Sequence, residues 1–141
     1  MDVKWESELL IASQRRDEAE QQRFLTLVDQ AFERCTLAVA KTLMRTFSDV
    51  PDFGTQERVC SVLASAPPEV AIRAKLEELP RLVVEAPEWA ESLIGEEVEH
   101  RPELLKSVAA SMPAAVKLSL RQLLGNKEFR DFYPNAAGVA V

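Results

Sequence analysis

Apolar residues recur at the spacing of one helix face along almost the whole chain, and this period constrains the fold more than any other feature. One run follows the i, i+3, i+4, i+7, i+8 pattern of an amphipathic helix: Phe24, Leu27, Val28, Ala31 and Phe32. Alternating strand patterns and Asn-Gly hairpin signals are missing. The period predicts helices in the first half at about residues 2–13, 17–35, 36–47 and 56–64, with a loop at 48–54.

Prolines divide the second half of the chain into short segments. Five of them can occupy the first turn of a helix, where the missing N–H costs nothing: Pro68, Pro80, Pro87, Pro102 and Pro113. Pro68 and Pro102 lie 34 positions apart, a spacing that stacked helix pairs produce. The sequence therefore predicts an all-α fold of stacked antiparallel short helices, a HEAT-like α-superhelical domain. Two of these helices carry inward stripes, one of Leu104, Leu105, Val108, Ala109 and Met112 and one of Val116, Leu120, Leu123 and Leu124.

The length of 141 residues predicts a single helical domain over residues 1–141, with N-terminal helices in 1–35 and a tail at 135–141. The N-terminus has acids among its apolar residues, unlike a secretory signal, and no run approaches the roughly 20 apolar residues of a membrane span. Cys35 and Cys60 have no CxxC companion, so we expect two buried, reduced thiols. Together these features favour a cytoplasmic protein without a membrane segment.

Negative charge is concentrated in one segment. The chain carries −6 overall, but residues 77–99 hold eight acids and one base, which leaves +1 for the remainder. Lys and Arg are scattered, so nucleic acid is not an expected partner. The asymmetry indicates a docking surface for a basic partner. A merely solvated acidic face is the alternative interpretation.

A helix over the acidic segment would have two distinct faces. Five residues would point to the core: Trp89, Ala90, Leu93, Ile94 and Val98. Five would share the opposite face, with Glu91 at its border: Glu88, Ser92, Gly95, Glu96 and Glu99. Glu97 alone falls among the apolar positions, which requires either a break in the helix at Gly95 or a buried partner for Glu97. We favour the break.

Candidate chemistry is sparse. Glu97-Val-Glu-His100 matches the Glu-x-x-His half-motif of di-metal carboxylate bundles, but a working site needs a second copy and the chain has no other histidine. His100 is instead expected to end its helix, where positive charge favours the dipole. No nucleophile elbow or phosphate-cradling glycine loop accompanies the two cysteines. We expect no metal, no cofactor and no enzymatic activity, although an unrecognised carboxylate site stays open.

Four segments together resemble one protein family: Asp52-Phe-Gly-Thr-Gln-Glu-Arg-Val-Cys-Ser-Val-Leu63, Leu76-Glu-Glu-Leu-Pro-Arg-Leu82, Ala86-Pro-Glu-Trp-Ala90 and Phe129-Arg-Asp-Phe-Tyr-Pro134. They are similar to the small α-helical, HEAT-like immunity proteins of bacterial polymorphic-toxin and contact-dependent inhibition systems, over about residues 37–134. The resemblance implies a cytoplasmic protein that binds one cognate toxin and blocks it without chemistry of its own.

The resemblance also implies what kind of surface to expect. Toxin domains that cut nucleic acid are often basic, and an acidic inhibitor would capture them quickly through electrostatic steering. The candidate partner-binding residues are the glutamates of the acidic segment, with two aspartates as a second possible interface: Glu85, Glu88, Glu91, Glu96, Glu97, Glu99, Asp49 and Asp52. A helical adaptor or assembly factor of a bacterial complex remains the alternative function.

Overall fold

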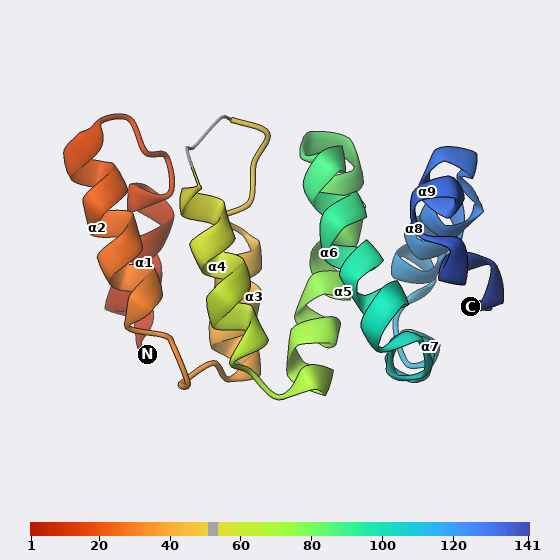
Figure 1. Ribbon diagram of the computed structural model, residues 1–141. Helices are drawn as coiled ribbons and strands as arrows, with labels where there is room; N and C mark the ends of the chain where they lie inside the picture. Colours follow the sequence, from red (N-terminus) through yellow and green to blue (C-terminus); the bar gives the residue numbers. More distant parts are fainter. Residues whose placement is uncertain (51–53) are drawn as a thin grey trace. The chain divides into compact units, whose positions relative to one another are not determined.

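A computed structural model describes residues 1–50 and 54–141 of the protein (Figure 1). Across these residues the secondary structure consists of nine α-helices and a C-terminal 3-10 helix, with no strand. The all-α prediction is confirmed for this part of the chain. The helices divide between two compact units, residues 1–71 and residues 72–141.

The N-terminal unit is built from four helices that run in alternating directions (Figure 1): α1 (Val3–Ala12), α2 (Glu18–Asp29), α3 (Leu37–Met44) and α4 (Thr55–Ala64). Helix α1 packs on α2 and α3, and both of these pack on α4. The buried Trp5 joins α1 to α2, because its indole Nε1 donates a 2.9 Å hydrogen bond to the Leu27 carbonyl. The largest fully buried side chains of this unit are Phe24, Phe47, Leu9, Leu27, Leu43, Met44 and Leu63.

Side-chain caps begin the first three helices close to where the sequence predicts. Asp2, Asp17 and Thr36 each accept a hydrogen bond from the backbone N–H three residues further on. Such a cap satisfies one of the N–H groups that a helix start leaves without a partner. The N-terminal ends of these helices are therefore fixed by local chemistry.

Helix α2 is shorter than predicted, because it ends at Asp29 and not near Cys35. Glu33 adopts a left-handed backbone conformation with φ of 61°, and Thr36 must be extended to cap α3. A continuous helix could accommodate neither residue. Phe32 consequently lies outside the helix and is 50% exposed, so its assignment to the inward stripe was wrong.

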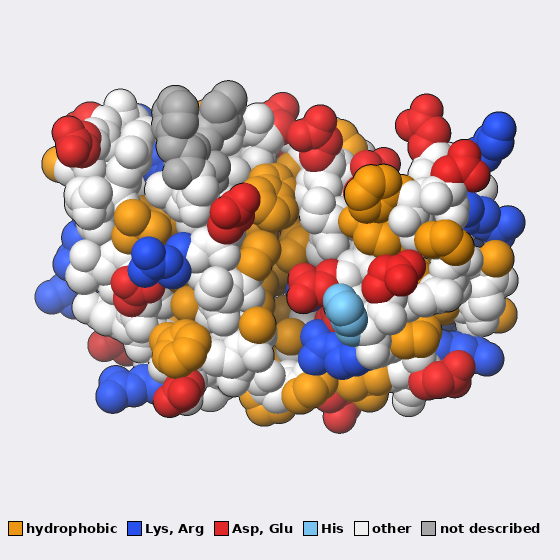
Figure 2. Space-filling model, in the orientation of Figure 1, with side chains coloured by type: hydrophobic (Ala, Val, Ile, Leu, Met, Phe, Trp, Pro, Cys, Tyr) orange, Lys and Arg blue, Asp and Glu red, His pale blue; other side chains and the backbone are white. Residues whose placement is uncertain are grey.

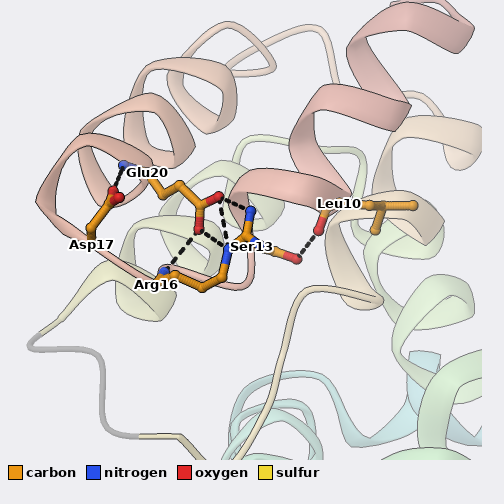
Figure 3. A network of polar contacts seen from close by, with 5 residues as sticks. All are labelled: Leu10, Ser13, Arg16, Asp17 and Glu20. Atoms are coloured by element: carbon orange, nitrogen blue, oxygen red, sulfur yellow. Dashed lines mark hydrogen bonds and ion pairs between the residues drawn. The ribbon is translucent and has the colours of Figure 1, made fainter.

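Figure 3 shows how the start of α2 is held by a small polar network. Asp17 caps the Glu20 N–H at 2.8 Å, while the Glu20 carboxylate accepts from the backbone N–H of Arg16 at 2.8 Å and from its guanidinium at 2.6 Å. These bonds from the Arg16 side chain and backbone lower the pKa of Glu20 from 4.5 to about 2. The hydroxyl of Ser13, just upstream, donates a 2.6 Å hydrogen bond to the Leu10 carbonyl.

We expect the Glu20 carboxyl to titrate near this lowered pKa. The contribution of Glu20 to the stability of the protein should therefore depend on pH. A carboxylate with a lowered folded-state pKa stabilises the protein above its unfolded-state pKa, and this contribution is lost as the pH falls from about 4.5 through about 2. Side-chain NMR titration measures the pKa directly. Arg16→Gln should raise it, whereas Arg23→Gln, which removes a partner of Glu8, should leave it unchanged. An unchanged pKa in the Arg16 variant would contradict this account.

The C-terminal unit contains most of α5 and all later elements: α5 (Pro68–Glu85), α6 (Pro87–His100), α7 (Pro102–Ala110), α8 (Ala114–Gly125), α9 (Lys127–Phe132) and the 3-10 helix η1 (Pro134–Gly138). Helix α6 packs on α7 and η1, and α8 packs on α7, α9 and η1. The largest fully buried side chains of the C-terminal unit are Phe129, Ile72, Leu76, Leu79 and Leu82. Ala136 of η1 is also buried.

Prolines begin helices as predicted at three positions, Pro68, Pro87 and Pro102, and Pro113 directly precedes α8. The prediction for Pro80 was wrong, because this proline lies inside the continuous helix α5. An internal proline removes one backbone hydrogen bond and costs about 3 kcal/mol. Leu76, Leu79 and Leu82 on either side of it are all buried, so the apolar area removed from water by the continuous helix offsets that cost.

The two predicted inward stripes are largely confirmed. Leu105, Val108, Ala109 and Met112 of the first stripe and Val116, Leu120 and Leu124 of the second are buried. Leu104 and Leu123 are only half-buried. They lie at the edges of their stripes, where a helix face turns toward water.

The two cysteines differ in their surroundings. Neither forms a disulfide, but Cys35 is buried and Cys60 is only half-buried, so the expectation of two buried thiols holds for one of them. Burial raises the pKa of the Cys35 thiol to about 11. The neutral thiol is therefore the form present at neutral pH, and Cys35 acts as a small apolar core residue.

Candidate functional site

The acidic segment forms the end of α5 and the whole of α6. Pro87 occupies the first turn of α6, Glu88 also lies there and His100 is its last residue. A proline has no N–H to leave without a partner at this position, and the negative charge of Glu88 in the first turn matches the helix dipole. The prediction that His100 ends the helix is confirmed.

Three carboxylates of α6 reach the surface of this segment without a charged partner among the described residues. Glu88 and Glu96 are exposed and Glu91 is half-buried. No ion pair or side-chain hydrogen bond joins any of the three to another described residue. We call Glu88, Glu91 and Glu96 the acidic face of α6. Figure 2 shows acidic side chains on this part of the C-terminal unit, beside apolar ones.

The neighbouring glutamates differ from the acidic face because they have partners within the protein. Glu85 lies 3.6 Å from the Arg81 guanidinium, and Arg81 also contacts Glu78. Glu99 accepts a 3.3 Å hydrogen bond from the Asn135 amide in η1. Glu85 thus already has a cation beside it and Glu99 a hydrogen-bond donor, so both are weaker candidates for binding a partner.

Glu97 does not belong to this surface, and the expected break at Gly95 is wrong. Helix α6 continues through Gly95, and Glu97 is 0% exposed. Its carboxylate accepts a 3.3 Å hydrogen bond from Lys75 Nζ of α5 and two of 2.7 Å from Arg101. Lys75 is itself only 5% exposed. Because the two cations compensate the buried charge, the helix has no need to change direction.

Gly95 was expected on the solvent side but is buried beneath an aromatic ring. A Cβ atom at Gly95 would lie only 2.2 Å from the Tyr133 ring, far inside van der Waals contact. Only glycine lets the ring lie this close to the α6 backbone without displacement. Tyr133 follows α9, so this contact brings the C-terminal part of the chain against the acidic helix.

The contact between Tyr133 and α6 borders a cleft between α6 and α9 with a volume of about 400 Å³. The residues that line it are Glu88, Glu91, Ser92, Glu128, Phe129, Phe132 and Tyr133. We call it the acidic–aromatic cleft. Phe132 is 76% exposed, and its ring meets that of Tyr133 edge-on at a centroid distance of 4.8 Å. The cleft therefore offers both carboxylates and aromatic rings to a bound group.

The pKa of the Tyr133 phenol reports the negative potential here. Partial removal from water raises this pKa, and the carboxylates of Glu91, Glu99 and Glu96 raise it further. Both causes disfavour the phenolate, so the side chain is neutral and can donate a hydrogen bond at neutral pH.

Sequence reasoning missed the lining residues that α9 and the position after it contribute, which are Glu128, Phe129, Phe132 and Tyr133. The signal was present in the run Phe129-Arg-Asp-Phe-Tyr133, in which three aromatic residues fall within five positions at the end of a short helix. Phe129 alone is enough to anchor that helix in the core, since it is 2% exposed. An exposed second phenylalanine in such a helix is the feature that could have drawn attention.

The remaining sequence predictions fall outside the cleft. Trp89, predicted to lie in the core, is only half-buried. Asp49 is exposed in the N-terminal unit, and Asp52 lies outside the described residues.

No three His, Cys, Asp or Glu side chains group to hold a metal ion in the part of the chain that the structure describes. None of the described helices combines the length and the apolarity that crossing a bilayer requires.

Comparison with known protein families, curated proteins and solved structures found no match to this chain.

Proposed function

We propose that this protein is an immunity protein, which binds a cognate bacterial toxin in the cytoplasm of the producing cell and neutralises it without catalysis. The observation that carries the proposal is the acidic face of α6, whose three carboxylates have no cationic partner among the described residues. The resemblance to helical immunity proteins supplies the toxin as partner and implies a HEAT-like scaffold.

Charge and exposure support a role for the acidic face in fast association. Exposed carboxylates at the rim of an interface attract a basic partner over several ångströms and raise the association rate. They contribute less to the lifetime of the complex, because water and salt screen them. Glu97 takes no part in this surface, since its charge is buried and already paired.

Reversing two of these charges is expected to slow association by about tenfold at low salt, which is within the range that electrostatic steering provides. The variant carries both Glu88→Lys and Glu96→Lys. Its association is measured with the protein encoded by the neighbouring gene. Surface plasmon resonance at two salt concentrations measures both rates. The effect should shrink above physiological ionic strength, where the screening length is about 8 Å.

A matched control is Glu18→Lys with Glu57→Lys. It changes the net charge by the same amount, and both residues are exposed acids in the first turn of a helix. This control should associate with nearly the wild-type rate. Equal slowing in both variants would show that net charge alone matters, and unchanged rates in both would rule out the acidic face. Binding of the neighbouring gene product without inhibition of any toxic activity would favour a helical adaptor.

A further inference from the structure

The acidic–aromatic cleft combines two features that a solvated surface does not require. The first is Phe132, whose large apolar side chain is 76% exposed although it follows the buried Phe129 by one helical turn. The second is a set of three carboxylates on the cleft wall, those of Glu88, Glu91 and Glu128. A ligand that is both cationic and planar can contact the ring and the carboxylates together.

The cations of the protein leave these carboxylates uncompensated. None of the three forms an ion pair with a described residue. Arg130, the nearest arginine along the chain to Glu128, donates a 2.6 Å hydrogen bond from its Nε to the Leu124 carbonyl. The cleft therefore presents negative charge to a cation from outside.

We propose that the acidic–aromatic cleft receives an arginine side chain of a basic polypeptide partner. A guanidinium is planar, stacks on aromatic rings and donates to carboxylates in pairs, so it uses both features of the cleft. A volume of about 400 Å³ lies at the lower end of the range for ligand sites and has room for such a side chain. This inference rests on the proposed function for the identity of the polypeptide, but not for the chemistry of the site.

Two other cations fit the cleft less well. A divalent metal ion requires several close oxygen ligands, and the described residues include no group of three metal-ligating side chains. It would also make no use of Phe132 or Tyr133. A lysine ammonium is a compact and strongly hydrated charge, which stacks on aromatic rings less readily than a guanidinium.

The test uses the full chain and a Gly-Arg repeat peptide as the probe. A peptide of the same length with citrulline in place of arginine keeps the shape of the side chain but removes its charge. NMR titration should show shifts at Phe132, Tyr133 and the α6 carboxylates with the arginine peptide. We expect binding of the citrulline peptide to be at least about tenfold weaker, because the charge-assisted hydrogen bonds are lost.

Phe132→Ala should weaken binding of the arginine peptide by about three- to tenfold, the range expected for a cation–π contact. Val84→Ala is the matched control, since Val84 is 78% exposed but does not line the cleft. It should bind the peptide as the wild type does. Thermal melts of both variants check that the fold is intact.

Equal affinity for the two peptides, or an unchanged affinity after Phe132→Ala, would overturn the inference. Neither result bears on the toxin. If the wild type inhibits the neighbouring gene product and Phe132→Ala inhibits it equally well while losing the arginine peptide, the cleft binds arginine but the toxin docks elsewhere. If the wild type inhibits nothing, the proposed function fails and the peptide data still decide the chemistry of the cleft.

Discussion

Replacing Glu97 by alanine is expected to lower the free energy of unfolding by about 3–5 kcal/mol, the usual cost of removing one partner of a buried ion pair. Glu97 is 0% exposed, and its carboxylate forms an ion pair with Lys75, which is 5% exposed. Without the carboxylate, the Lys75 ammonium would lie buried with its main compensating charge gone. Loss of the carboxylate costs less free energy at Arg101, because 31% of its side chain is exposed and water can solvate the guanidinium.

Urea unfolding measures this loss, and Glu96→Ala provides the control. Glu96 precedes Glu97 on α6 but is exposed and has no ion-pair partner among the described residues, so its removal should change stability by less than about 0.5 kcal/mol. Replacing both buried partners, by Lys75→Met with Glu97→Leu, should cost less than Glu97→Ala alone, because no charge is then left buried. Similar stability in Glu97→Ala and Glu96→Ala would refute the buried pair.

The second large effect is expected at Phe129. Phe129→Ala should destabilise the protein by about 3–5 kcal/mol, the usual cost of deleting a buried aromatic ring and leaving a cavity. Phe129 is 2% exposed, and its helix α9 packs on α8 and η1. Asn126 caps α9 through a 3.0 Å hydrogen bond from the Phe129 N–H, but so short a helix depends on tertiary packing.

Phe132→Ala, on the same helix, is the natural comparison. Its ring is 76% exposed, so its removal should cost less than about 0.5 kcal/mol. Thermal and urea unfolding of the two variants would separate a residue that maintains the fold from one that is available for binding. A large loss of stability in both variants would mean that Phe132 packs more closely than its exposure indicates.

Local patterns predict those parts of the fold that local chemistry decides. The helical period, the caps at Asp2, Asp17 and Thr36 and the prolines at helix starts are all readable because each acts within one turn of its own position. Pro80 shows the limit of this reasoning. Its local preference is to begin a helix, but burial of the leucines around it by other elements determines the outcome.

The candidate site was less accessible from the sequence, because its decisive contacts join distant residues. Glu97 looked anomalous on its helix face. Arg101 lies only four positions further on, but the buried partner Lys75 lies 22 positions earlier on another helix. Gly95 falls on the solvent side of the helical wheel, but it is covered by the ring of Tyr133. A helical wheel describes one helix only, so it cannot contain either partner.

Tyr133, which lies close to Gly95 of α6, is an intrinsic spectroscopic probe of this part of the protein. Tyr133 is the only tyrosine of the chain, and the carboxylates of Glu91, Glu96 and Glu99 raise the pKa of its phenol. A cation that settles among these carboxylates stabilises the phenolate and lowers that pKa. The ultraviolet absorbance of one phenol, followed with pH, therefore registers occupancy of the acidic–aromatic cleft without any added dye.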